Sequence, residues 1–335
     1  MHDYRNLGRT GVKVSPLCLG CMNFGGKTDE AQSAQIIDRA LDAGINFLDT
    51  ANVYHRGDSE EAVGKALEQN RRRDHVILAT KVHGPMAKDE PNAGGNHRRH
   101  ILRQCEASLR RLQTDWIDLY QIHRPQSDIP LDETLRALDD LIRSGKVRYI
   151  GSSTFAAWQL VESLWIAREL GLNRFVTEQP PYHLLDRRIE RELIPMAQTY
   201  GFALIPWSPL AGGFLTGKYR RGEQPPSDAR LQRKNERTEA LLSDAGFDVL
   251  EKAEQFASEK GCTVSQLALA WCMGQPGITS PIIGPRTLEQ LDDNLGAMDV
   301  ALSDEDRQHL DEVAPPGTAV ANYYTADFGP HQHRW

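Results

Sequence analysis

The sequence has no long apolar run. No stretch approaches the roughly 20 residues that a membrane-spanning helix needs, and no apolar segment of a secretory signal follows Met1. These absences argue against a membrane partner and against export. We therefore expect a cytoplasmic protein.

Cysteine is scarce and shows no pattern of pairing. Five cysteines, an odd number, are spread over 335 residues, which indicates reduced thiols rather than a disulfide framework. Cys18 and Cys21 form one Cys-x-x-Cys pair, and there is no second pair to complete a four-cysteine zinc site. A redox-active pair is the alternative, but residues 15–20 predict a short apolar strand with two small buried thiols.

Net positive charge is also lacking. The formal net charge is −7 and the isoelectric point is about 5.9, so no general surface field attracts nucleic acid or an anionic membrane. The basic clusters Arg71–Arg73 and Arg98–Arg99 are short and lie beside expected helix ends, where solvated charge explains them. We expect no nucleic-acid partner.

A regular alternation of strand-like and amphipathic helix-like segments is present, with a repeat of about thirty residues, the length of one βα unit. With 40% hydrophobic and 25% charged residues, the composition is that of a globular protein. Eight segments are predicted to be strands: residues 17–20, 45–49, 76–81, 117–123, 147–151, 175–179, 203–207 and 280–284.

Eight βα units favour an α/β fold of the closed (β/α)₈ or TIM-barrel type, whose active sites lie at the C-terminal ends of the strands. A doubly wound sheet shares the alternation. Its dinucleotide fingerprint, Gly-x-Gly-x-x-Gly after the first strand, is missing, because Gly20–Gly26 does not fit it. The barrel is therefore the preferred architecture.

The remaining segments suggest a single barrel domain over residues 1–335. Residues 1–15 predict an N-terminal β-hairpin around the turn at residues 8–11. Long loops, residues 83–96 and about 211–238, follow the third and seventh strands, and residues 315–335 form a C-terminal tail. Asp58 with Glu61 predicts a capping box at a helix start just beyond Tyr54.

Four polar side chains follow predicted strands. The first strand to show this stops on Asp49, with Tyr54 one short loop later, and others stop on Lys81 and His123. A phenol is a weak acid, yet a buried neighbouring ammonium favours the phenolate, and the ammonium itself needs a carboxylate partner. Together these groups predict a proton relay aimed at an oxygen that gains or loses charge, as in carbonyl reduction.

At this point the sequence resembles the aldo-keto reductase superfamily, in the branch of potassium-channel β subunits and bacterial NADPH-dependent reductases. The resemblance covers nearly the whole chain. It is carried by the motifs Asp49-Thr50-Ala51-x-x-Tyr54, Thr80-Lys81, Gln121-Ile122-His123, Gly151-Ser152-Ser153-Thr154-Phe155, Gln179, Trp207-Ser208-Pro209-Leu210 and Ile283-Gly284-Pro285-Arg286. It implies a reductase that transfers a hydride from NADPH to an aldehyde or ketone, reversibly, with Tyr54 as general acid/base, Lys81 tuning its acidity, Asp49 anchoring Lys81 and His123 positioning the carbonyl.

The resemblance also implies a cofactor site for NADP(H). Ser153 and Gln179 match positions that hold the nicotinamide carboxamide, and Tyr182 matches an aromatic position near the ring. Arg286 is a sensible clamp for the 2′-phosphate, because guanidinium binds phosphate in a bidentate manner, so we expect NADP rather than NAD. The other expected contacts are Gly20, Met22, Asp49, Thr154, Trp207, Ser208, Leu210, Gly212, Lys218, Ile283, Gly284, Gln290 and Asn294.

One departure concerns Thr154, which stands where many members have asparagine and offers one donor in place of two. The small-molecule carbonyl substrate is expected to meet Asn23, Tyr54, His55, His83 and His123. The physiological carbonyl, the direction of the reaction in the cell, the oligomeric state and the role of the tail are not determined by these patterns.

Three alternatives accompany this interpretation. The segment Gly212–Lys218 nearly matches a Walker A loop, but Tyr219 stands where a magnesium-binding hydroxyl belongs, so nucleotide hydrolysis is disfavoured.

A metal-dependent hydrolase would use Asp49, His55, His123 and His183, and would leave Lys81 unexplained. His331 and His333 in the tail lack further ligands, so we expect no metal. The third alternative is that the protein is an NADPH-binding partner subunit with little turnover.

Overall fold

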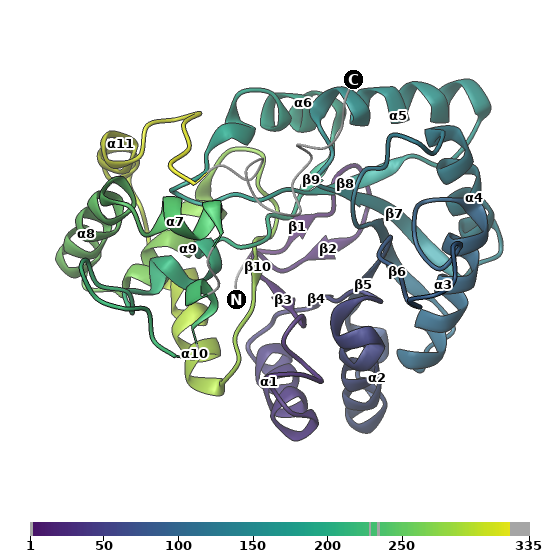
Figure 1. The fold of residues 1–335 in the computed structure, drawn as a ribbon, viewed down its shortest axis with the longest axis horizontal. Coiled ribbons are helices and arrows are strands. Elements are labelled where there is room, and N and C mark those ends of the chain that lie inside the picture. The colour runs from purple at the N-terminus through teal and green to yellow at the C-terminus, as the bar shows by residue number, and fades with distance from the viewer. Residues whose placement is uncertain (1–2, 228, 233–234, 322–335) are drawn as a thin grey trace.

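In the computed structural model, which describes residues 3–227, 229–232 and 235–321, eight parallel strands form one curled sheet (Figure 1). In chain order they are β3 (Cys18–Gly20), β4 (Phe47–Asp49), β5 (Ile77–Val82), β6 (Ile117–Ile122), β7 (Val147–Ser153), β8 (Phe175–Gln179), β9 (Ala203–Leu204) and β10 (Ile282–Ile283). Each strand pairs with its neighbour in the sequence, and β10 returns to pair with β3. The predicted (β/α)₈ barrel is confirmed.

The ring closes between β9 and β10 through single bridges rather than a full ladder. Leu204 pairs with Ile278, and Trp207 pairs with both Ile282 and Pro181. β9 is shorter than predicted because Pro206 cannot donate a backbone hydrogen bond, although its carbonyl accepts from the Ile282 N–H at 2.8 Å. The loose junction places the chain after β9 at the mouth of the barrel.

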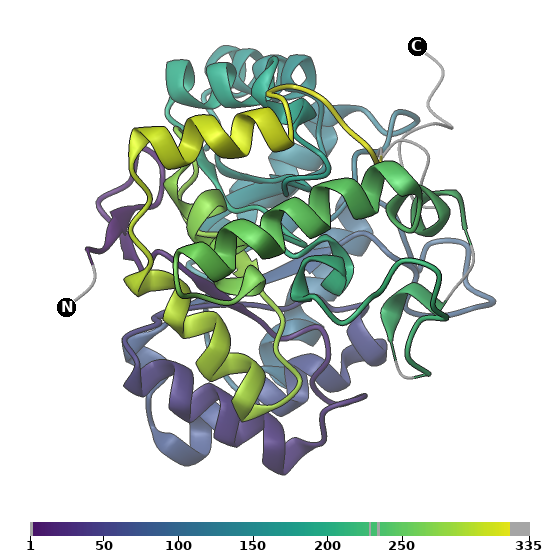
Figure 2. The ribbon, with the colours of Figure 1, turned by 90° about the vertical axis from the view of Figure 1, so that its left-hand side faces the viewer.

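Helices alternate with the strands and surround them (Figure 1). They are α1 (Glu30–Asp42), α2 (Asp58–Asn70), α3 (Arg98–Arg111), α4 (Leu131–Arg143), α5 (Ala157–Leu170), α6 (Leu193–Tyr200), α7 (Glu236–Leu241), α8 (Asp244–Glu259), α9 (Val264–Gly274), α10 (Leu288–Gly296) and α11 (Asp304–Val313). Figure 2 shows α11, α8 and α10 covering one side. None of the helices in the described ranges combines the length and apolar character that a membrane crossing requires.

The N-terminal hairpin β1 (Arg5–Asn6) and β2 (Lys13–Val14) is antiparallel, as predicted. Its side chains Leu7 and Val14 belong to a small buried cluster that includes Phe47, Ala79 and Leu119 from β4, β5 and β6. Because alternate residues of a strand point to opposite faces, these strand residues share one face, the barrel interior. The hairpin therefore closes the interior at the end opposite the strand C-termini.

The same period of two brings polar side chains to the interior at the other end. Asp49, Lys81 and Gln121 each stand two residues beyond an interior residue of the cluster, Phe47, Ala79 and Leu119 respectively. The intervening residues Leu48 and Tyr120 instead join the larger core between the strands and the helices. The barrel thus stacks a polar layer directly on an apolar one.

The prediction of a capping box at Asp58 was wrong. A short 3₁₀ turn, residues Tyr54–Gly57, runs directly into α2, so Asp58 is the first helical residue and Gly57 takes the cap position. Gly57 has φ of 111°, which glycine adopts without a steric penalty. The turn that begins with Tyr54 leads into the helix without a gap.

The described part of the C-terminal tail, residues 315–321, is fixed to the loop after β8. The Arg187 N–H donates to the Thr318 carbonyl at 2.8 Å, and the Val320 N–H donates to the Leu185 carbonyl at 2.9 Å. The Arg187 side chain is buried and forms ion pairs with Glu190 and Asp311. The predicted tail residues beyond 321, including His331 and His333, lie outside the described residues.

Candidate active site

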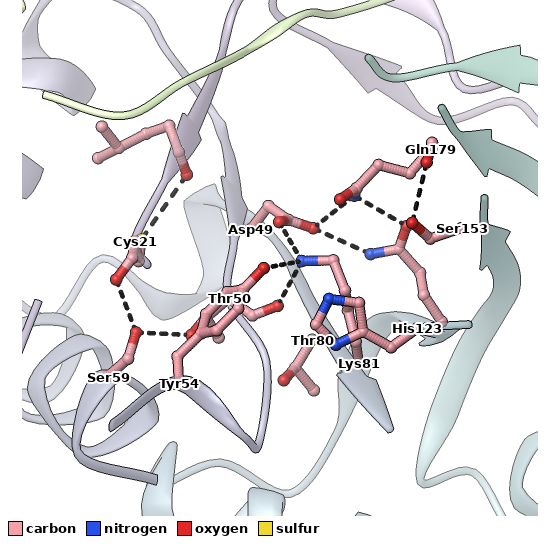
Figure 3. A network of polar contacts seen from close by, with 12 residues as sticks. Cys21, Asp49, Thr50, Tyr54, Ser59, Thr80, Lys81, His123, Ser153 and Gln179 are labelled. Carbon is pink, nitrogen blue, oxygen red and sulfur yellow. Dashed lines mark hydrogen bonds and ion pairs between the residues drawn. The ribbon is translucent and has the colours of Figure 1, made fainter. Parts of the chain in front are cut away.

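Lys81 stands at the centre of the polar layer (Figure 3). Its side chain is fully buried, and its ammonium donates to Asp49 Oδ1, to the Thr50 carbonyl at 2.8 Å and to the Tyr54 hydroxyl at 3.4 Å. Burial alone would lower the pKa of Lys81, but the Asp49 carboxylate and the Tyr54 phenol raise it overall. Lys81 therefore stays charged at neutral pH, and its charge acts directly on the phenol oxygen.

Asp49 is held from its second oxygen as well. Oδ2 accepts from Gln121 Nε2 at 2.9 Å and from Gln179 Nε2 at 3.0 Å, while Gln179 Nε2 also lies 3.2 Å from Gln121 Oε1. Gln121 was not among the predicted site residues. Its position two residues after the interior residue Leu119 is the sequence signal that would have placed it here.

His123 lies beside Tyr54. The two rings are nearly perpendicular, with centroids 5.6 Å apart. Burial, reinforced by the charge of Lys81, lowers the pKa of His123 well below its usual range. The imidazole is therefore neutral at pH 7, so it acts as a hydrogen-bonding group beside the phenol and not as a second cation.

The turn that carries Tyr54 is fixed from beneath. The Ser59 hydroxyl donates to the Cys21 carbonyl at 2.7 Å and contacts the Thr50 hydroxyl at 2.8 Å. This chain of hydrogen bonds joins the start of α2 to the ends of β3 and β4 (Figure 3). The position of the phenol is thereby defined by two strands and a helix.

A large cavity of about 1180 Å³ opens above this layer. Tyr54 and His123 line the cavity. Lys81 is fully buried behind the Tyr54 phenol and does not line it. Of the expected substrate contacts, Asn23 and His55 also line it. Fifteen of the expected cofactor contacts do so too: Gly20, Met22, Asp49, Ser153, Gln179, Trp207, Ser208, Leu210, Gly212, Lys218, Ile283, Gly284, Arg286, Gln290 and Asn294.

Three predicted site residues lie elsewhere. Tyr182 is buried against Trp271, with ring centroids 5.0 Å apart, and its hydroxyl donates to Glu190 at 2.5 Å. Thr154 has φ of 63° and turns its hydroxyl back onto the Ser153 carbonyl at 2.7 Å. His83 contacts Asn96 at 2.9 Å. Trp207 does line the cavity with its aromatic side chain.

The residues present fit a nicotinamide cofactor. Gln179 uses its amide nitrogen on Asp49, which leaves Oε1 to accept from a carboxamide N–H. In the loop after β9, Gly212 and Gly213 have φ of 70° and 93°, and a Cβ on Gly213 would lie 3.3 Å from Lys218 Nζ. A side chain there would crowd the amine, so glycine keeps Lys218 accessible to a phosphate.

The alternatives lack support in the described residues. Cys18 and Cys21 are free and buried, and burial together with the Asp49 charge raises the pKa of both thiols, which makes them unreactive. Within residues 3–227, 229–232 and 235–321, no three His, Cys, Asp or Glu side chains gather in a way that could hold a metal ion. The metal-dependent hydrolase therefore has no ligand set there.

Comparison with known proteins gives one consistent family. A model of the Aldo/keto reductase family matches residues 16–315. The uncharacterized oxidoreductase YrpG of Bacillus subtilis is 43% identical over 333 residues, which covers 96% of this chain and 99% of that protein. A probable voltage-gated potassium channel subunit beta of Arabidopsis thaliana is 39% identical over 306 residues (89% and 92%).

A third relative is the versiconal hemiacetal acetate reductase of Aspergillus parasiticus, 36% identical over 339 residues, covering 94% of this chain and 97% of that protein. The resemblance drawn from the sequence motifs is confirmed, including its potassium-channel β-subunit branch. The chain belongs to the aldo/keto reductase family.

Proposed function

We propose that this protein is an NADPH-dependent carbonyl reductase that converts an aldehyde or ketone to an alcohol, and that the reaction is reversible. The observation that carries the proposal is the position of Lys81, whose ammonium contacts the Asp49 carboxylate and the Tyr54 hydroxyl at once. An oxidoreductase function agrees with the family and with the oxidoreductase relatives.

Each residue has a distinct task in this mechanism. Bound NADPH supplies the hydride that the carbonyl carbon receives. The Tyr54 hydroxyl gives its proton to the carbonyl oxygen, and the Lys81 ammonium stabilises the phenolate that remains. Neutral His123 hydrogen-bonds the same oxygen and orients it. In the reverse direction, Tyr54 accepts the proton.

We assign NADPH rather than NADH because Arg286 lines the cavity. The Arg286 N–H donates to the Gln290 side chain at 2.8 Å, which fixes the start of α10 around the guanidinium. A guanidinium suits a 2′-phosphate, and Lys218 beside Gly213 suits a pyrophosphate. Ser153 and Gln179 would hold the carboxamide, and Trp207 would lie against the ring.

The test is Tyr54→Phe, assayed by NADPH absorbance with 4-nitrobenzaldehyde. We expect kcat to fall by about 10²- to 10⁴-fold, the usual contribution of a positioned general acid, while NADPH still quenches protein fluorescence. Tyr200→Phe is the matched control, since Tyr200 is exposed at the end of α6, and its rate should equal that of the wild type. A Tyr54→Phe protein with the full rate would refute the mechanism.

A second candidate is a cofactor-binding partner subunit with little turnover. It is favoured by the relatives from Arabidopsis thaliana and Oryza sativa, each called a probable voltage-gated potassium channel subunit beta. The complete contact chain from Asp49 through Lys81 to Tyr54 favours catalysis. Tight NADPH binding without turnover across a broad panel of aldehydes and ketones would favour the partner role.

A further inference from the structure

The charged side chains of the cavity are mostly cationic. Among the described residues, six cations line it, against three acids: Lys27, Arg124, Lys218, Arg230, Arg237 and Arg286, against Asp49, Glu289 and Asp293. Asp49 is already paired with Lys81, and both other acids belong to α10, beside Arg286. Among the described lining residues, the acids other than Asp49 therefore lie on the Arg286 side of the cavity.

Arg124 is one of two cations lining the cavity that the described contacts place against a histidine. It follows His123 directly, and its Nη1 donates to the His123 carbonyl at 2.8 Å. Asn96 donates to the Arg124 carbonyl at 2.9 Å from its side chain and to Gln126 Oε1 at 2.8 Å from its backbone. The Asn96 side chain thus fixes the backbone at Arg124, and the half-buried guanidinium is bonded to the backbone of His123.

Arg237 is the other. It lies on α7, and its guanidinium carbon is 5.5 Å from the centroid of the Trp207 ring. Its Nη2 lies 3.4 Å from Nε2 of the buried His183. The Leu185 N–H donates to His183 Nδ1 at 3.2 Å, so the ring proton of the neutral imidazole is on Nε2, facing Arg237. A ring proton on Nε2 rules out a hydrogen bond from Arg237 to this nitrogen, so the contact with the Trp207 ring orients the guanidinium.

The two arginines come from different sides of the barrel mouth. Arg124 follows β6, and Arg237 lies over Trp207, which follows β9, three strands further around the sheet. A molecule whose carbonyl meets Tyr54 and His123 therefore has Arg124 at its reacting end and Arg237 across the cavity. Partly desolvated guanidinium groups form charge-assisted hydrogen bonds that are about twice as strong as neutral ones, and bidentate ones with carboxylate or phosphate.

We infer that the substrate is an anionic carbonyl compound, an aldehyde or ketone whose carbon skeleton also carries a carboxylate or phosphate that Arg124 or Arg237 binds. This inference rests on the proposed reductase function and adds the substrate class. Lys218 and Arg286 remain on the proposed cofactor side of the same cavity. The oxyanion and the carbonyl then fix the substrate at two points, which orients the carbonyl oxygen toward Tyr54.

The test compares matched aldehydes that differ in charge. One pair is 4-carboxybenzaldehyde and its methyl ester, and the other is glyceraldehyde 3-phosphate and glyceraldehyde. With the wild type we expect kcat/KM to be at least tenfold higher for the charged member of one pair, which also tells carboxylate from phosphate. That advantage should shrink as salt is raised. Equal values within both pairs would overturn the inference.

Substitutions assign the effect to the two residues. At least one of the variants Arg124→Gln and Arg237→Gln should reduce the charged-to-neutral ratio of kcat/KM by about tenfold or more. Arg136→Gln is the matched control, because Arg136 is half-exposed on α4 and pairs with Asp132, and its ratio should equal that of the wild type. Circular dichroism checks that each variant is folded. An unchanged ratio in both cavity variants would refute the assignment.

The outcome is separable from the proposed function. If neutral aldehydes are reduced but charge gives no advantage, the reductase proposal stands and the inference fails. If no aldehyde is reduced, the reductase proposal fails. Calorimetric titration of both aldehyde pairs into the NADPH-bound protein then decides the inference, since at least tenfold tighter binding of the charged member of either pair supports it and equal binding within both pairs refutes it.

Discussion

The floor and the rim of the cavity are built on different principles. At the floor, Lys81, Asp49 and Gln121 come from three adjacent strands and are buried. Lys81 and Gln121 each form a hydrogen bond with Asp49. At the rim, Arg124 and Arg237 come from a loop and a short helix and are half-buried. The floor has one arrangement set by strand register, whereas the rim can change with loop sequence while the strands stay the same.

On the proposed function, the buried residues of the floor carry out the reaction, whereas the residues of the rim recognise the substrate. Removing one partner of a buried ion pair leaves an uncompensated charge, so the floor should tolerate almost no substitution. A cation at the rim keeps contact with water and can be exchanged at a smaller cost in stability. Loops carried by a rigid barrel are where substrate range diversifies within one fold.

The largest expected effect is that of Lys81→Met. It removes the cation from the phenol and leaves Asp49 buried without its counter-charge, so we expect the rate to fall at least 100-fold and the free energy of unfolding to fall by about 3–5 kcal/mol. Urea unfolding and the pH profile of kcat measure the two effects. Adding Asp49→Asn to Lys81→Met should restore part of the stability and none of the rate.

The control for that comparison is Lys65→Met, which removes an exposed lysine that pairs with Glu30 across a solvated surface. It should leave the rate and the unfolding midpoint unchanged. If Lys81→Met proved as mild as Lys65→Met, the floor would be no more constrained than the surface, and the distinction drawn above would not hold.

A smaller effect is expected at the far end of the rim. Arg286→Ala should raise KM for NADPH by about 10- to 100-fold, because a charge-assisted contact to phosphate is lost, and should leave KM for NADH nearly unchanged. Initial-rate measurements with both cofactors check this. Equal increases for the two cofactors would place Arg286 away from the 2′-phosphate.

The smallest effect concerns Glu178, which is buried below the turn at Thr154 and accepts from the Ser152 hydroxyl at 2.6 Å and the Phe155 N–H at 3.1 Å. Burial raises the pKa of Glu178 to about 8 from 4.5. The folded protein thus keeps a proton that the unfolded chain releases, and stability falls as pH rises through this window, by about 1.4 kcal/mol per pH unit.

Glu178→Gln removes that proton linkage, since glutamine does not ionise. The difference in unfolding free energy between variant and wild type should move in favour of the variant from pH 6 to pH 7. Urea titrations at both pH values measure it, and Glu162→Gln, on the outer helix α5, provides a matched control with no such shift. Parallel pH dependences for Glu178→Gln and wild type would show that Glu178 is already ionised.

The sequence was sufficient for the barrel and for most of the floor. Strands that stop on Asp49, Lys81 and His123 are visible as patterns, and the period of two determines which side chains point inward. Gln121 obeys the same rule, but a neutral amide at a strand end is a weaker sign of a functional site than a charged group. The capping error at Asp58 arose because a 3₁₀ turn precedes the helix without a gap.

The rim could not be predicted in this way. Arg237 meets Trp207 and His183 only because the chain after β9 folds back over the mouth, and no periodicity encodes that path. For Tyr182, by contrast, the sequence pattern predicts a contact with the cofactor, but the side chain does not line the cavity. Its position matched a family pattern, yet packing against Trp271 and a hydrogen bond to Glu190 hold it in the core.

Closure of the ring by β3 and β10 has a consequence for biosynthesis. One edge of β3 is covered only by β10, near the end of the chain, and Arg5 donates to the Met273 and Ile278 carbonyls just before that strand. Until residue 283 has left the ribosome, the nascent chain therefore has an unpaired edge on β3 and an N-terminal hairpin that lacks its contacts with the later chain. Both features favour aggregation. Products that stop short of Ile282 should therefore be found in the insoluble fraction.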